Sequence, residues 1–252
     1  MTKSVLKKVA VYLTLGMFWG LGILSCAAQT FSTGLAPTPG VLVSQGLNSN
    51  NNGQNLEKTL VDIKAVDPPA LRTKEGRLGM ASEERYGQGI IIDADGIIAT
   101  NRHIIGNAQH IYVVLSGGKI LEAKLIRNSK ADLCLIKIND PTPLKAVSLA
   151  DASDVRVGSN VIAIANAGFN PQRVLGGQIV QIFKEVSSDN IEMLETNISL
   201  KPGDSGGPIL NENGSLLGLI MGKQISDPSK SYAIASNRIQ LEYFKYRNSI
   251  LN

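Results

Sequence analysis

The chain has 252 residues, a formal net charge of +4 and 43% hydrophobic residues, enough for one ordinary domain or two small ones. Lys3, Lys7 and Lys8 lie in the first 28 residues, where no acidic residue offsets them, so the remainder is close to neutral. A near-neutral chain without a basic stripe interleaved with aromatic residues argues against a nucleic-acid partner.

Residues 1–28 have the layout of a secretory signal peptide. Lysines precede an apolar run over residues 9–24, and small residues follow up to Ala28, after which we expect cleavage. The run is shorter than the roughly 20 residues of a bilayer-spanning helix, although an uncleaved leader remains an alternative. Ile23-Leu24-Ser25-Cys26 also resembles a bacterial lipoprotein box, in which lipidation of Cys26 would provide a membrane tether.

Residues 29–55 are polar, turn-rich and asparagine-rich at their end. Such a composition cannot bury enough apolar surface to order itself, so we expect a flexible linker. A short helix should follow, with Leu56, Leu60 and Ile63 on one face and the Pro68-Pro69 pair as its stop. That helix would pack on its own domain or form an oligomer contact.

From residue 89 onward, short apolar runs bounded by turn residues replace helical periods. The runs cover residues 90–92, 97–99, 111–115, 121–126, 133–138, 161–165, 178–182, 191–196, 209–210, 216–221 and 232–235. Asp95-Gly96, Gly117-Gly118 and Asn213-Gly214 supply the positive backbone angles of tight hairpins. The pattern predicts an antiparallel all-β fold.

The final stretch has a different pattern. Ser236 can cap a helix over about residues 237–250, in which Leu241, Tyr243 and Phe244 give an apolar side. Nothing in the sequence beyond this helix predicts a peptide-binding PDZ module.

Three separate motifs suggest nucleophilic chemistry. Gly203-Asp204-Ser205-Gly206-Gly207-Pro208 sets Ser205 among backbone donors that can converge on an anion formed beside its hydroxyl. A serine hydroxyl needs a base to take its proton and an acceptor to orient that base. His103 follows a predicted strand end and Asp132 opens another strand-like segment, so they are the candidates, while His110 should be solvated.

Each motif also has a structural alternative. Ser205 could be a turn hydroxyl, His103 could be a structural or surface histidine, and Asp132 could cap a turn after residues 128–130. Asp93-Ala94-Asp95-Gly96 resembles a calcium loop but lacks further ligands, so a hairpin turn is predicted. We expect no metal and no cofactor. Cys26 and Cys134 should form no intramolecular disulfide, since one lies in the leader and the other in a predicted buried strand.

The order His103, Asp132, Ser205 and the sequence around each resemble the chymotrypsin-type serine proteases, most closely their bacterial HtrA/Deg branch. Sequence segments similar to those of this family also occur at residues 87–96, 156–158 and 232–237, so the resemblance extends from about residue 56 nearly to the C-terminus. It implies two six-stranded antiparallel β-barrels with a C-terminal helix.

The resemblance gives a domain plan, with a trypsin-like protease domain over residues 56–252. We place the first barrel at about residues 70–142 and the second at about 143–235, because prolines near Asp140-Pro141-Thr142-Pro143 break strand ladders. A cleft between the barrels would bring His103 and Asp132 against Ser205.

In this family Ser205 would attack a peptide carbonyl, His103 would transfer the proton, and Asp132 would orient the imidazole. The N–H groups of Gly203 and Ser205 would form the oxyanion hole. Ser199, Leu200, Met221 and Gly222 would line the substrate pocket.

An acidic residue is missing from that pocket set, which argues against trypsin-like cleavage after basic residues. We expect small aliphatic residues before the cut, with an acidic preference through Lys201 and Lys223 as the alternative.

Asp204 departs from the branch, which usually carries asparagine there. In zymogen-activated relatives this aspartate pairs with a newly cut N-terminus, but no Ile-Val-Gly-Gly-like start follows a basic residue near Arg85. We therefore expect Asp204 to find another partner or to be exposed.

The combined prediction is an exported serine endopeptidase, periplasmic or extracellular, that cuts unfolded or exposed protein segments. The resemblance also implies a homo-oligomer, a trimer. The alternative is a non-catalytic peptide-binding or chaperone-like relative with an inactive oxyanion loop.

Overall fold

The computed structural model describes residues 56–74, 77–165, 172–185, 191–224 and 226–251. The predicted signal peptide with Cys26 and the predicted linker lie outside these residues. Among the helices that the structure describes, none combines the length and the hydrophobicity that crossing a membrane would need.

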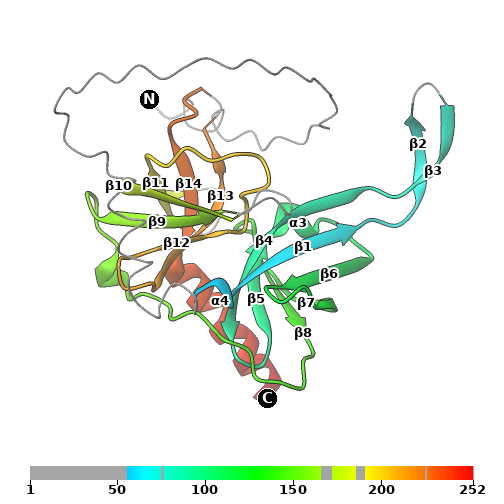
Figure 1. Cartoon of the computed structure of the whole chain (residues 1–252), viewed down its shortest axis with the longest axis horizontal. Coiled ribbons are helices and arrows are strands. Elements are labelled where there is room, and N and C mark those ends of the chain that lie inside the picture. Colours follow the sequence, from blue (N-terminus) through cyan, green and yellow to red (C-terminus); the bar gives the residue numbers. More distant parts are fainter. Residues whose placement is uncertain (1–55, 75–76, 166–171, 186–190, 225, 252) are drawn as a thin grey trace, which may run out of the picture.

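Two closed six-stranded antiparallel barrels form the body of the molecule, which confirms the predicted fold class (Figure 1). The first barrel contains β1 (Leu60–Val66), β4 (Glu84–Asp93), β5 (Ile97–Asn101), β6 (His110–Leu115), β7 (Ile120–Asn128) and β8 (Leu133–Ile138). The second contains β9 (Asn160–Ala165), β10 (Arg173–Glu185), β11 (Ile191–Thr196), β12 (Pro208–Leu210), β13 (Leu216–Lys223) and β14 (Ser231–Ala235).

Five further named elements lie outside the barrels in the described structure. They are the hairpin strands β2 (Ala70–Lys74) and β3 (Arg77–Ala81), the one-turn helix α3 (Arg102–Ile105), the 3-10 turn Ala152–Asp154 and the C-terminal helix α4 (Ser236–Leu251). The β2–β3 hairpin projects away from the barrels in Figure 1. The sequence analysis did not predict it.

The buried apolar residues explain why the strands have continuous apolar runs. Ile91 and Ile98 belong to a cluster of first-barrel residues, whereas Ile90 and Ile97 belong to a cluster shared with the second barrel and α4. A third cluster lies among second-barrel residues. Strands at the junction are therefore buried on both faces, which gives runs without polar alternation.

The prediction of a helix near Leu60 and Ile63 is wrong, because these residues lie in strand β1. Since β1 is a strand of the first barrel, that barrel begins at Leu60 rather than near residue 70. Val61, Ile63 and Ala65 are buried and alternate with more exposed residues, which is the period of a strand. Strand β1 pairs with both β4 and β6. Its pairing closes the barrel, whereas a helix would leave two strand edges open.

Hairpin turns occur at the predicted glycines. Gly96, Gly118 and Gly214 all have positive φ angles, between 79° and 88°. In the β4–β5 turn the amide of Gly96 donates to the carbonyl of Asp93 at 2.9 Å, and the Asp93 carboxylate accepts the Asp95 amide at 2.8 Å. These contacts agree with a hairpin turn at residues 93–96.

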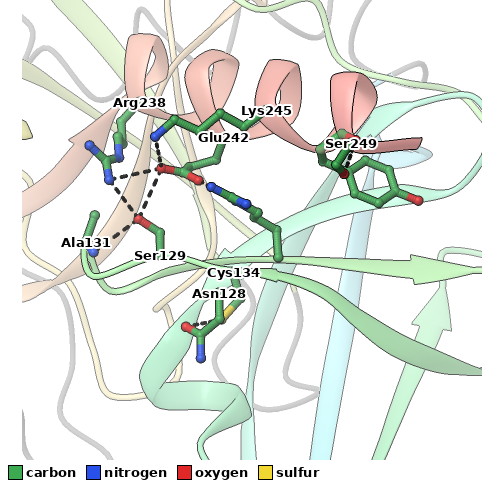
Figure 2. A network of polar contacts seen from close by, with 10 residues as sticks. Asn128, Ser129, Ala131, Cys134, Arg238, Glu242, Lys245 and Ser249 are labelled. Atoms are coloured by element: carbon green, nitrogen blue, oxygen red, sulfur yellow. Dashed lines mark hydrogen bonds and ion pairs between the residues drawn. The ribbon is translucent and has the colours of Figure 1, made fainter. Parts of the chain in front are cut away.

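Helix α4 packs against strands of both barrels, and one buried carboxylate fastens it to the first (Figure 2). Glu242, only 2% exposed, accepts from Arg127 at 2.8 Å and pairs with Arg238 at 3.0 Å and Lys245 at 3.4 Å. Arg238 also donates to the Ser129 hydroxyl at 3.0 Å. The helix is thereby joined to the β7–β8 loop, residues 129–132.

The same contacts determine the charge state of Glu242. Burial alone would raise the pKa of its carboxyl, but the hydrogen bond from Arg127 and the charges of Arg238 and Lys245 outweigh that effect. The net result is a pKa below the ordinary value of 4.5, so the ionised form stabilises the fold.

Glu242→Gln should lower the free energy of unfolding by about 3 kcal/mol at neutral pH, because it leaves the buried Arg238 without its counter-charge. A lowered folded-state pKa contributes stability above the unfolded-state pKa, and this contribution disappears as pH falls through the folded-state value. The difference in free energy of unfolding between wild type and variant should therefore shrink below pH 4.5, the ordinary pKa of a glutamate. Urea unfolding across pH 3 to 8 measures it, with the exposed Glu57→Gln as control. A constant or absent gap would contradict the assignment.

Candidate active site

His103 lies on the single turn of α3, directly after β5. Ile104 and Ile105 are buried and anchor this turn, while the His103 side chain is 24% exposed. The apolar pair therefore fixes the backbone and leaves the imidazole at the surface of the barrel junction.

Asp132 joins the start of α3 to the β7–β8 loop. Its Oδ2 atom lies 2.8 Å from His103 Nδ1, and its Oδ1 atom accepts the His103 backbone amide at 2.9 Å. Its own carbonyl accepts the amide of Arg102 at 3.0 Å. With the proton on Nδ1, the Nε2 atom of His103 is left as an acceptor.

The backbone of Asp132 is unusual, since its φ of 46° lies in the left-handed region. Non-glycine residues adopt this conformation at a cost and mostly where surrounding contacts enforce it. The contacts with α3 do so here, as does the hydrogen bond from the Ser129 amide to the Leu133 carbonyl at 2.9 Å. The amide of Ala131 also donates to the Ser129 hydroxyl at 3.3 Å.

Arg85 on β4 fixes the other end of α3. Its guanidinium donates to the carbonyls of Ile104 at 3.1 Å and Ile105 at 2.8 Å. It also forms two hydrogen bonds to the Asp67 carboxylate, at 2.6 and 2.5 Å, and this contact raises the pKa of Arg85. The last carbonyls of a helix need such partners. Sequence reasoning missed this pair, because neither residue stands in a recognisable motif.

The loop of Ser205 is held by the backbones of both barrels. The Ser205 carbonyl accepts the amide of Gln88 on β4 at 2.9 Å, and the Gly206 amide donates to Ile220 on β13 at 2.9 Å. Gly206 has a φ of 83°, and a Cβ there would lie 1.8 Å from the Gln88 carbonyl oxygen. Only glycine permits this approach.

Ile104 connects the Ser205 loop to α3. A Cβ on Gly87 would lie 2.3 Å from Ile104 Cδ1 and 3.2 Å from the Ser205 carbonyl oxygen. A Cβ on Gly206 would lie 3.2 Å from the same Ile104 atom. The structure therefore brings the segments that carry His103, Asp132 and Ser205 together where the barrels meet.

The Ser205 hydroxyl does not point its proton at the imidazole in this structure. It donates to the Met221 carbonyl at 3.1 Å, and among the described residues it has no hydrogen bond to His103. A hydroxyl has one proton, so donation to Nε2 of His103 requires rotation about the serine side-chain bond.

Among the described residues, the predicted oxyanion donors have no protein acceptor. Gly203 has a φ of 94°, and in the described part of the chain the amides of Gly203 and Ser205 have no hydrogen-bond partner. Two unpaired N–H groups beside a serine hydroxyl suit an anion that forms there.

The predicted pocket residues differ in exposure. Ser199 is exposed, and Met221 and Gly222 are partly exposed, with open space where a Cβ on Gly222 would lie. Leu200 is only 4% exposed and belongs to the second-barrel cluster, so its side chain lies in the core rather than at the surface.

The other residues singled out in the sequence have the following surroundings. His110 is exposed, as predicted, and contacts Glu122 at 3.0 Å. Cys134 is buried, which raises the pKa of its thiol to about 12 and keeps it protonated at neutral pH. Asp204 is fully buried and pairs with Arg173 rather than being exposed.

Comparison with known families agrees with the fold. The family model described as a trypsin-like peptidase domain matches residues 87–219. The periplasmic serine endoprotease DegP of Escherichia coli is 31% identical over 182 residues, covering 68% of this chain and 38% of DegP. The pH-dependent periplasmic serine endoprotease DegQ of the same species is 36% identical over 142 residues, covering 54% of this chain and 31% of DegQ. The matches thus span less than half of these relatives.

Solved structures with the same fold include a protease of M. tuberculosis in its active form and a serine endoprotease from Yersinia pestis. The first has a TM-score of 0.68 at 19% identity and covers 88% of this chain and 94% of its own. The second has a TM-score of 0.63 at 24% identity and covers 84% and 68%. At these identities the likeness concerns the fold alone.

Proposed function

The chain belongs to the trypsin-like peptidase family, and from this membership we propose that it is a serine endopeptidase with Ser205 as nucleophile. The observation that carries the proposal is the 2.8 Å contact between His103 and Asp132, on a turn packed against the glycine-rich loop of Ser205. This is the relation that a base and its orienting carboxylate need.

The reaction would proceed through an acyl-enzyme. Ser205 Oγ would attack the peptide carbonyl as its proton passes to Nε2 of His103, and the imidazolium would be stabilised by Asp132. Collapse of the tetrahedral intermediate would break the C–N bond, and His103 would give the proton to the departing amine. Water, activated by the same imidazole, would then release the acid and restore Ser205.

The amides of Gly203 and Ser205 would stabilise the oxyanion of that intermediate. Backbone donors held in place before the reaction need no reorganisation, and removing one such donor typically costs a factor of about 10² to 10³ in turnover. The positive φ of Gly203 supports this role, since a side chain at this position would be strained.

We propose protein substrates with unfolded or exposed segments, and small aliphatic side chains before the cut. Met221 and Gly222 offer an apolar, open surface beside the Ser205 hydroxyl, and none of the four pocket residues is acidic. The exposed cations Lys201 and Lys223 support an acidic preference as the competing specificity.

A peptide-library digest read by mass spectrometry distinguishes these specificities. We expect cleavage after Ala, Val, Leu or Ile to exceed cleavage after Asp, Glu, Lys and Arg by at least about tenfold, the size of a one-methylene effect or more. Enrichment of Asp or Glu before the cut would instead place Lys201 or Lys223 in the pocket, and enrichment of Lys or Arg would contradict both specificities.

A second candidate function has its own observation. The Ser205 hydroxyl donates to Met221 rather than to His103, as expected of a site that binds peptides without cutting them. In that case a chemical probe of nucleophilicity would find Ser205 inert, although unfolded protein would still bind.

Labelling with a fluorophosphonate separates the two functions. Wild type should be labelled and Ser205→Ala should not, because the probe bonds only to an activated serine oxygen. Asp132→Asn should be labelled roughly 10⁴-fold more slowly, the loss known for the equivalent change in a trypsin-type triad. A folded wild type that binds unfolded casein but resists labelling would establish the non-catalytic function.

The relatives named above are periplasmic, and we propose export of this chain as well, with residues 1–28 as the signal. The mature protein should then begin after Ala28, or at a lipidated Cys26, and assemble as a trimer. Denaturing mass spectrometry reports the cleavage and any lipid, and native mass spectrometry reports the assembly. A full-length monomer in the cytoplasm would contradict all three statements.

A further inference from the structure

An ion pair with a buried carboxylate lies immediately beside Ser205. The Asp204 carboxylate is fully buried and accepts two hydrogen bonds from Nη2 of Arg173, at 2.5 and 2.7 Å. Arg173 is the first residue of β10 and pairs in the ladder with Ala165 of β9, so a regular sheet fixes its position.

The same carboxylate supports the turn that carries the oxyanion donor. Asp204 Oδ2 accepts the Lys201 amide at 2.7 Å, and the Asp204 amide donates to the Lys201 carbonyl at 3.1 Å. Side chain and backbone thus close one turn over residues 201–204, with Gly203 at a φ of 94° inside it. Any displacement of Asp204 would therefore move the amides of both Gly203 and Ser205.

A buried carboxylate without a counter-charge is strongly unfavourable, so the ionised form of Asp204 needs a cation beside it at this position. An N-terminal amine released by cleavage near Arg85 cannot provide this cation. That residue lies within β4, opposite Ala65 in the barrel ladder, and its side chain already holds Asp67 and the end of α3. Cutting the chain there would dismantle the first barrel.

We propose that Arg173 is a positioning residue that holds Asp204, and through it the oxyanion donors of Gly203 and Ser205, in the reactive arrangement without any cleavage of the chain. The proposal rests on the proposed peptidase function. It adds that the cation required by Asp204 is an internal part of β10, so the loop is ordered as soon as the second barrel has folded.

The test compares variants of the full chain by the rate of fluorophosphonate labelling, by kcat and KM on a peptide that wild type cleaves, and by thermal unfolding. Arg173→Met should lower kcat and the labelling rate by at least about 10², the cost of losing an oxyanion donor. KM should stay within about threefold, since ground-state binding does not use these donors. Arg156→Met is the matched control in the same barrel, because Arg156 is exposed and should change neither rate.

A double variant shows whether Arg173 acts through Asp204. In Arg173→Met with Asp204→Asn the buried charge is gone, so kcat should recover at least about tenfold relative to Arg173→Met alone. Arg173→Lys, which keeps the positive charge but loses the planar geometry, should fall between wild type and Arg173→Met. If Arg173→Met does not fold, Arg173→Lys is compared with wild type instead, and an unchanged kcat and labelling rate would contradict the positioning role.

Three results would overturn the proposal: a folded Arg173→Met at wild-type rates, a double variant no faster than the single one, or a folded Arg173→Lys as slow as Arg173→Met. A wild type that is folded but never labelled would instead remove the peptidase function itself. The failure of the positioning role and the failure of the enzyme assignment are therefore distinguishable.

Discussion

The contact between the Ser205 loop and strand β4 is the constraint on which the candidate site depends. The Gln88 amide binds the Ser205 carbonyl, and Gly206 lies so close to the Gln88 carbonyl that no side chain fits between them. This contact joins a loop of the second barrel to a strand of the first. Since α3 packs on the same strand through Ile104, the serine and the imidazole acquire a common support.

Three ionic contacts, each with a buried or partly buried carboxylate, extend this support to the loops. Arg85 with Asp67 holds the end of α3, Arg173 with Asp204 holds the turn before Ser205, and the Glu242 network holds the loop before Asp132. Each loop lacks the ladder hydrogen bonds of a strand, so its backbone groups must be satisfied by side chains. The long arginine side chains can reach backbone and carboxylate groups on other elements, which shorter polar side chains cannot.

Local sequence patterns predicted the strands from residue 89 onward, their glycine turns and the C-terminal helix, because apolar runs and turn residues are local signals. Strand β1 was missed, since Leu56, Leu60 and Ile63 also fit a helical face and only barrel closure decides between the two. The roles of Arg85, Arg173 and Glu242 could not be predicted. Each depends on a partner distant in sequence, and a single arginine or glutamate gives no pattern.

Buried ion pairs are often no better for stability than well-packed apolar residues of similar size. Here an apolar replacement would have a further consequence, because Arg85 satisfies two carbonyls of α3 and Asp204 satisfies the amide of Lys201. An apolar side chain would leave those backbone groups buried without partners or force the loops to move toward water. The ion pairs are therefore better understood as determinants of loop geometry than as sources of net stability. All three ion pairs contact segments next to Ser205, His103 or Asp132, so they maintain the relative positions of these segments.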